Sequence, residues 1–142
     1  MTNAAHDRRC VALRQLHTAL RIYFDGEDFY SVVTLAGAAD EIFGQLLKQQ
    51  GLESSLESLK KAVVAIHGHL TGEAIEPKGV ADRANSARNA LKHWSPGQPL
   101  LVEFDVKQEA EDMLNRAIDN YWSLTTDLSP AMERFQRDYM AA

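Results

Sequence analysis

Cysteine is scarce in this sequence: Cys10 is the single one among 142 residues. An intramolecular disulfide and a cysteine-based metal cluster are therefore excluded. Long hydrophobic runs are also missing, and none approaches the roughly 20 residues that a membrane-spanning helix needs. The charged residues near the start are not followed by an apolar core, so we expect no signal peptide. Together these absences predict a cytoplasmic protein that does not enter a membrane.

Positive charge is in short supply, because the formal net charge is −5. That balance argues against non-specific coating of nucleic acid, which needs clustered cations. The deficit is local: residues 1–100 carry 11 Lys/Arg and 11 Asp/Glu, whereas residues 101–142 carry 4 and 9. Between 78 and 93 only Asp82 opposes four cations, which are Lys78, Arg83, Arg88 and Lys92. This segment is either a solvated helix face or a surface for an anion.

Apolar residues recur with helical spacing through most of the chain. The spacing predicts helices over about 7–24, 31–50, 54–70, 78–93 and 106–128, and a short helix from 130. The alternation in residues 100–106 has no partner strand, so we expect an extended connector there. Six helices with short loops in a chain of 142 residues predict one all-α domain (1–142), an antiparallel helical bundle.

Several helix boundaries carry recognisable capping residues. Ser54 precedes Glu57 by three residues, which is capping-box spacing. Asp105 is a good N-cap, and Ser129 followed by Pro130 restarts a helix. Gly26 is suited to end the first helix in a left-handed conformation.

The most distinctive polar segment is the end of the predicted 78–93 helix. Asn85, Asn89 and His93 fall at i, i+4 and i+8, which places them in one row on an ideal helix. Arg88 lies five residues before His93, about 140° round the helix axis. Within one chain that is not an ideal pair, but two copies related by a two-fold axis would bring each Arg and His into one cleft.

Such a cleft suits the cleavage of RNA phosphodiesters. A histidine that titrates near neutral pH can accept the proton of the 2′-hydroxyl or return one to the leaving oxygen. An arginine can stabilise the charge that develops on phosphorus, and an asparagine can orient the phosphate. No metal or other cofactor is required. The spacing alone is weak evidence, because 9 Arg and 5 His in 142 residues give about one such pair by chance.

The segment Arg88-Asn89-Ala90-Leu91-Lys92-His93 resembles the Arg-x4–6-His motif of the HEPN superfamily, in which a polar residue, often Asn, follows the Arg. The motif helix also comes fourth in a small all-α domain, as in HEPN domains. The resemblance implies a homodimer and a metal-independent endoribonuclease of toxin or phage-defence type, in which His93 is the acid or base, Arg88 the stabiliser and Asn89 the positioning residue. Arg83, Asn85 and Lys92 would then contact RNA.

One position differs from the family pattern. HEPN toxins that pair with a nucleotidyltransferase antitoxin often carry a Tyr two residues after the His, where this chain has Ser95. An antitoxin or other protein partner remains an expectation from the resemblance alone.

Other interpretations stay open. The chain can instead be a non-catalytic helical-bundle interaction module that uses the same dimer surface, or a bundle that binds a small molecule. The catalytic interpretation fails if Arg88 and His93 of two chains lie apart or pair with carboxylates of the bundle. His67, His69 and Glu73 are the best metal-ligand candidates, but His67 points away from the other two, and histidines near a helix C-terminus are explained by its dipole.

Overall fold

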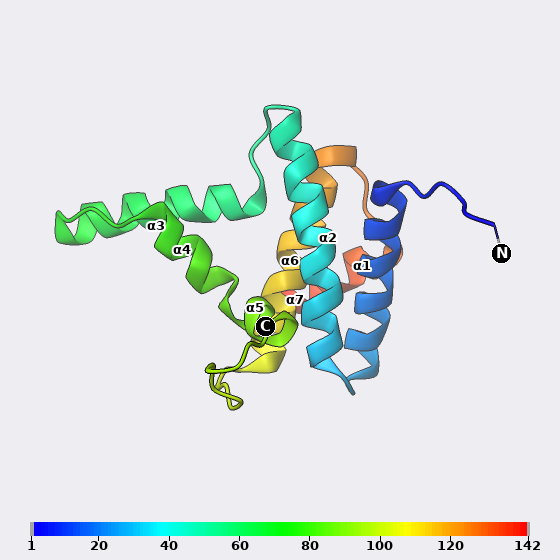
Figure 1. Cartoon of the computed structure of the whole chain (residues 1–142). Coiled ribbons are helices and arrows are strands. Elements are labelled where there is room, and N and C mark those ends of the chain that lie inside the picture. The colour runs from blue at the N-terminus through cyan, green and yellow to red at the C-terminus, as the bar shows by residue number, and fades with distance from the viewer. Residues whose placement is uncertain (1, 142) are drawn as a thin grey trace.

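The computed structural model describes residues 2–141, and these form seven α-helices and no strand (Figure 1). The helices are α1 (Arg8–Asp25), α2 (Phe29–Gln49), α3 (Ser55–Thr71), α4 (Pro77–Ala84), α5 (Ser86–Lys92), α6 (Val106–Thr125) and α7 (Pro130–Ala141). The predicted all-α class is confirmed, and residues 101–105 lie outside the helices, with Val106 already in α6. None of the helices in the described part is long and apolar enough to cross a membrane.

The body of the protein is built by α1, α2, α6 and α7 around one apolar core. Helix α2 lies at its centre and makes its most extensive contacts with α6 and α1. The largest fully buried apolar side chains come from all four helices: Leu16, Leu20, Val32, Val33, Leu47, Met113, Leu114, Ile118, Met132 and Phe135. Residues of this kind each stabilise the fold by about 1.5–3 kcal/mol relative to an exposed position.

The capping residues predicted from the sequence are in place. The Ser54 hydroxyl accepts a hydrogen bond from the backbone N–H of Glu57 (3.2 Å), and the Asp105 carboxylate accepts one from the N–H of Gln108 (3.1 Å). Gly26 ends α1 with φ of 74°, a left-handed conformation that favours glycine. These short-range interactions fix where three of the helices begin or end.

One prediction about helix continuity is wrong. The expected helix over 78–93 is interrupted at Asn85, which separates α4 from α5, and His93 already has extended backbone angles. The N–H of Asn89 still donates to the Asn85 carbonyl, and that of His93 to the Asn89 carbonyl (2.9 Å each), so the spacing of the row is kept. Its members differ in burial, because Asn85 is half-buried, whereas Asn89 and His93 are exposed. The reason for the interruption is a tertiary hydrogen bond to Asn85, described below.

Helix α3 departs from a simple bundle. It runs away from the body, and α4 returns beside it (Figure 1). Not one of its 17 residues is buried. We call this projecting pair of helices the α3 arm. The chain is therefore a compact helical body that carries an arm, and α5 lies where the arm rejoins the body.

Helix α7 closes the core at the other side. Phe135 lies between Tyr23 and Tyr139, with ring centroids 5.4 Å and 5.5 Å away. The Tyr23 hydroxyl donates a hydrogen bond to Glu111 (3.0 Å), and burial together with this carboxylate raises the pKa of Tyr23 to about 12. At neutral pH the phenol therefore stays protonated and keeps this bond between α1 and α6.

Candidate functional site

Asp40 of α2 is the centre of a buried polar cluster. It is 4% exposed, and its Oδ2 accepts a hydrogen bond of 2.7 Å from Nη2 of Arg116. Asn120 donates through Nδ2 to Asp40 Oδ1 (3.1 Å) and to its backbone carbonyl (3.2 Å). Burial raises the pKa of Asp40, and the attraction of Arg116 and Arg88 opposes that rise. We call Asp40, Arg116 and Asn120 the Asp40 cluster.

The Asp40 cluster sets the position of two other segments. Arg116 donates through Nη1 to the Asn85 side-chain oxygen (2.9 Å) and to the Ala84 carbonyl (3.3 Å). It thereby holds the junction of α4 and α5 against α6 and explains the break in the helix. Asn120 accepts a hydrogen bond from the backbone N–H of Ser55 (2.8 Å), which fixes the start of the α3 arm. One buried cluster thus aligns α2, α6, α5 and α3.

Arg88 crosses α2 above this cluster at a position where α2 has no side chain. A Cβ placed on Gly37 would lie 2.6 Å from Cδ of Arg88, so only glycine leaves room for it. The Arg88 side chain is 14% exposed, and its Nη1 lies 4.0 Å from both Asp40 Oδ2 and Glu41 Oε2. These distances allow electrostatic attraction but are too long for hydrogen bonds.

The guanidinium of Arg88 is poorly supplied with hydrogen-bond acceptors. Its one hydrogen bond, from Nη2 to the side chain of Asn89, is 3.5 Å long. Its Nε is buried and has no partner within residues 2–141. An arginine carries five N–H donors, so most of the donors of Arg88 are unused in a largely buried position.

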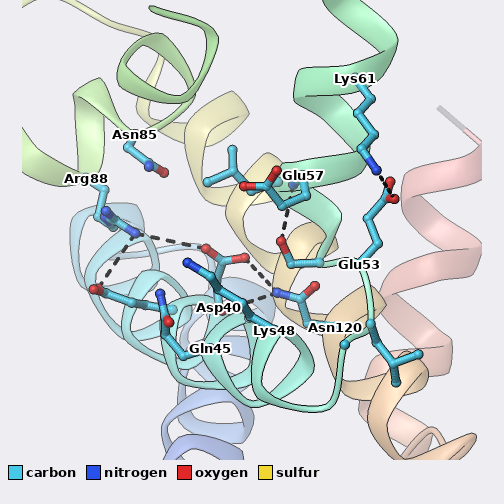
Figure 2. A pocket seen from close by; sticks show the side chains of 15 residues that line it. Asp40, Gln45, Lys48, Glu53, Glu57, Lys61, Asn85, Arg88 and Asn120 are labelled. Atoms are coloured by element: carbon cyan, nitrogen blue, oxygen red, sulfur yellow. Dashed lines mark hydrogen bonds and ion pairs between the residues drawn. The ribbon is translucent and has the colours of Figure 1, made fainter. Parts of the chain in front are cut away.

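A groove of about 580 Å³ opens beside Arg88, between α2, α5 and the start of α3 (Figure 2). Its cations are Arg88, Lys48 and Lys61, and its carboxylates are Asp40, Glu41, Glu53 and Glu57. Lys61 and Glu53 neutralise each other at 2.7 Å, and Arg116 neutralises Asp40. We call this the Arg88 groove. In the described chain no three His, Cys, Asp or Glu side chains gather closely enough to hold a metal ion.

The residues singled out from the sequence are divided between this groove and the outer surface. Arg88 and Asn85 line the groove. Asn89, Lys92, His93 and Arg83 are exposed outside it. His93 caps the end of α5, where its backbone N–H donates to the Asn89 carbonyl (2.9 Å). Arg88 therefore lies within α5 and His93 at its C-terminal end, and the groove that Arg88 lines does not include His93.

The Asp40 cluster was not predicted from the sequence, although the sequence contains a signal for it. Arg116 and Asn120 stand at i+3 and i+7 from Met113, on the apolar stripe of α6 that also contains Ala117. Asp40 follows the buried Ala39 on the inner face of α2. Polar side chains on the buried face of two helices imply a buried hydrogen-bonded partner, since an unpaired one would be costly.

Alanine at Gly37 should test whether Arg88 is held in the groove. Gly37→Ala is expected to lower the free energy of unfolding by about 1–3 kcal/mol, because the new methyl overlaps Arg88. Gly44→Ala is the matched control, since a Cβ there meets its neighbours at 3.6 Å and 3.7 Å, and alanine should stabilise the helix by about 0.5–1 kcal/mol. Urea denaturation measures both. Equal stabilisation by both substitutions would mean that Arg88 leaves the groove freely.

No protein-family model matches the sequence, and no curated protein and no solved structure is significantly similar to the chain.

Proposed function

We propose that the chain is a HEPN-like protein that binds RNA, with Arg88 as its main phosphate contact and His93 as the group that cleaves the phosphodiester without a metal. The observation that carries the proposal is the set of unused donors on Arg88. Its guanidinium lines an open groove, and its Nε is buried without a hydrogen-bond partner. An unmet buried donor costs about 1–3 kcal/mol, and a phosphate that accepts from the N–H groups of Arg88 facing the groove would lower the cost of this poorly paired guanidinium.

Phosphate is the anion that suits this position. Its oxygens accept the paired N–H groups of an arginine in a bidentate geometry. Asp40 is the nearest buried carboxylate, but Arg116 already neutralises it at 2.7 Å. Glu41 is 54% exposed at its side chain and can turn toward water when a phosphate approaches. Lys48 lines the same groove and adds a second positive charge along the path of a nucleic-acid backbone.

His93 supplies the acid–base chemistry in this proposal. Its exposure at the end of α5 leaves the imidazole open to a bound RNA strand. Asn89 orients Arg88 or the phosphate, and Lys92, Arg83 and Asn85 attract flanking phosphates. A strand that enters the groove at Arg88 and leaves past the end of α5 would pass both Arg88 and His93. A homodimer would provide two such sites.

RNA cleavage in the presence of a chelator tests the proposal. The purified protein is incubated with single-stranded RNA in EDTA beside the His93→Ala and Arg88→Ala variants. We expect cleavage by the wild type, a loss of about 10²–10⁴-fold for His93→Ala, and a loss of about 10²–10³-fold for Arg88→Ala. His93 is exposed, so its variant should fold normally, as circular dichroism will verify.

Matched controls are available elsewhere in the chain. His6→Ala and Arg137→Ala remove an exposed histidine and an exposed arginine far along the chain from α5, and neither should change cleavage. Cleavage that is equal in all variants would contradict the assignment of His93 and Arg88. Absence of both cleavage and RNA binding in the folded wild type would contradict the RNA function as a whole.

A second candidate is a non-catalytic protein-interaction module. The observation that favours it is the approach of Arg88 to Asp40 and Glu41, because an arginine held between carboxylates of its own chain serves the fold. The exposed apolar residues of the α3 arm also suit a protein partner. A folded wild type that neither binds nor cleaves RNA would select this candidate.

A further inference from the structure

The α3 arm carries an apolar surface that the rest of the chain leaves open. Along α3, Leu59 is 39% exposed, Ile66 is 59% exposed and Leu70 is 75% exposed. Val63 lies between them and is half-buried. We call these four residues the α3 stripe. Their steps of four, three and four residues keep them on one face of the helix, the spacing with which paired helices pack against each other.

The lysines of α3 and α4 already have carboxylate partners in the described chain. Lys60 pairs with Glu57 at 2.8 Å, Lys61 with Glu53 at 2.7 Å, and Lys78 with Asp82 at 2.9 Å. The described part of the arm therefore offers no unpaired lysine that would select an acidic partner. A neutral apolar seam with helix-pairing spacing is complementary to a second copy of itself.

We propose that a second copy of this chain covers the α3 stripe, with the two α3 helices antiparallel. In that register Leu59 of one copy packs on Leu70 of the other, and Val63 packs on Ile66. All four layers of the seam then contain two apolar side chains. Because each arm projects from one side of its body, the antiparallel arrangement places the two bodies at opposite ends of the paired arms (Figure 1).

Charges at the two ends of the arm support the antiparallel direction. Glu73 and Glu76 follow the tip of α3, and neither forms an ion pair within residues 2–141. Lys48 lies at the base of the arm in the Arg88 groove, and its ammonium is likewise unpaired in the described chain. Antiparallel pairing brings the acidic tip of each copy to the base of the other, where Lys48 is.

The arrangement also defines how two RNA sites would be spaced. Helix α3 has 17 residues and is thus about 25 Å long. The two Arg88 grooves would lie at opposite ends of the arm pair, so arm pairing by itself would not form the two-chain cleft of Arg88 and His93 that the motif implies. The pairing rests on the stripe and on the charges at its two ends, and it holds whether or not the chain acts on RNA.

Sedimentation over a wide concentration range tests the pairing. Four side chains on one helix bury less area than the roughly 800 Å² per partner of a standard interface. We therefore expect a weak, micromolar dimer. The wild type should pass from monomer to dimer between about 5 µM and about 500 µM. The double variant Ile66→Glu/Leu70→Glu should remain monomeric at every concentration, with an unchanged melting temperature because both side chains are exposed.

A matched control replaces equally exposed apolar residues elsewhere. Leu100 and Leu101 of the connector are 80% and 89% exposed, and Leu100→Glu/Leu101→Glu should dimerise like the wild type. A wild type that stays monomeric throughout, or a control that loses the dimer as fully as the stripe variant, would overturn the proposal. The RNA-cleavage assay is also run on the stripe variant. A monomeric variant that cleaves RNA like the wild type would show that the dimer and the RNA function are lost independently.

Disulfide trapping then tests the direction of the helices. In a Cys10→Ser background, Leu59→Cys and Leu70→Cys are prepared as separate proteins and oxidised mildly. Antiparallel pairing predicts that neither forms a disulfide dimer alone, whereas a mixture of the two does. Dimers formed efficiently by each variant alone would mean parallel helices and would overturn the proposed register.

Discussion

Replacing Asp40 with alanine is expected to lower the free energy of unfolding by about 3–5 kcal/mol. The substitution leaves the guanidinium of Arg116, whose side chain is only 8% exposed, without its carboxylate. Asn120 loses one of the two acceptors of its amide at the same time. Because a domain of this kind is stable by about 5–15 kcal/mol in total, the loss should be visible as a large shift of the urea midpoint.

The neighbouring residue provides the control for this substitution. Glu41 follows Asp40 in α2 and approaches the same Arg88 nitrogen at 4.0 Å, but its side chain is 54% exposed. Glu41→Ala should therefore change stability by less than about 1 kcal/mol. If Asp40→Ala were as mild as Glu41→Ala, Arg116 would have to reach water in the variant, and the cluster would not be the closed unit described above.

Much of the fold could be predicted from the sequence because its determinants are local. The apolar spacing of α1, α2 and α6 matches the faces that are buried, and Ser54, Asp105 and Gly26 end or begin helices through contacts a few residues away. The break at Asn85 could not be predicted in this way. Val80, Ala84, Ala87 and Leu91 continue one helical period across it, and the interruption comes from Arg116, 31 residues further on.

The α3 arm shows that the spacing of apolar residues predicts a helix but not what packs against it. The spacing of Leu59, Ile66 and Leu70 correctly predicted an amphipathic helix, yet their face is not covered by the chain's own core. Periodicity states which side of a helix is apolar but not what packs on it. That information depends on how the neighbouring segments turn, and here α4 packs against α3 but leaves Leu59, Ile66 and Leu70 exposed.

The candidate site was predicted in part. The motif drew attention to Arg88, and the structure places Arg88 in a groove with unused donors. The motif could not indicate that Asp40, Arg116 and Asn120 hold the segment in place, because these residues are far apart in the chain. His93 and Asn89 are exposed, and their roles remain predictions that the cleavage assay decides.

Arg116→Met is expected to cost about as much as Asp40→Ala, about 3–5 kcal/mol, because it leaves the Asp40 carboxylate buried without its cation. The double variant Asp40→Leu/Arg116→Met should recover most of that loss and lie within about 1–2 kcal/mol of the wild type, since two apolar side chains need no ion partner. Asn120 would still donate to the backbone carbonyl of residue 40, as it does now at 3.2 Å. Urea denaturation of the four proteins gives the coupling free energy of the pair.

The result separates two reasons for keeping an ion pair in the core. Strong coupling with a stable double variant would mean that replacing the ion pair hardly changes the free energy of unfolding. The role of the pair would then be to position Asn85 and α5 through the second nitrogen of Arg116. A double variant as unstable as either single one would contradict this, because it would mean that the hydrogen bonds to Asn85 and Ala84 stabilise the fold more than the pair itself. In the first case the orientation of α5, and with it of Arg88 and His93, is what the buried charges maintain.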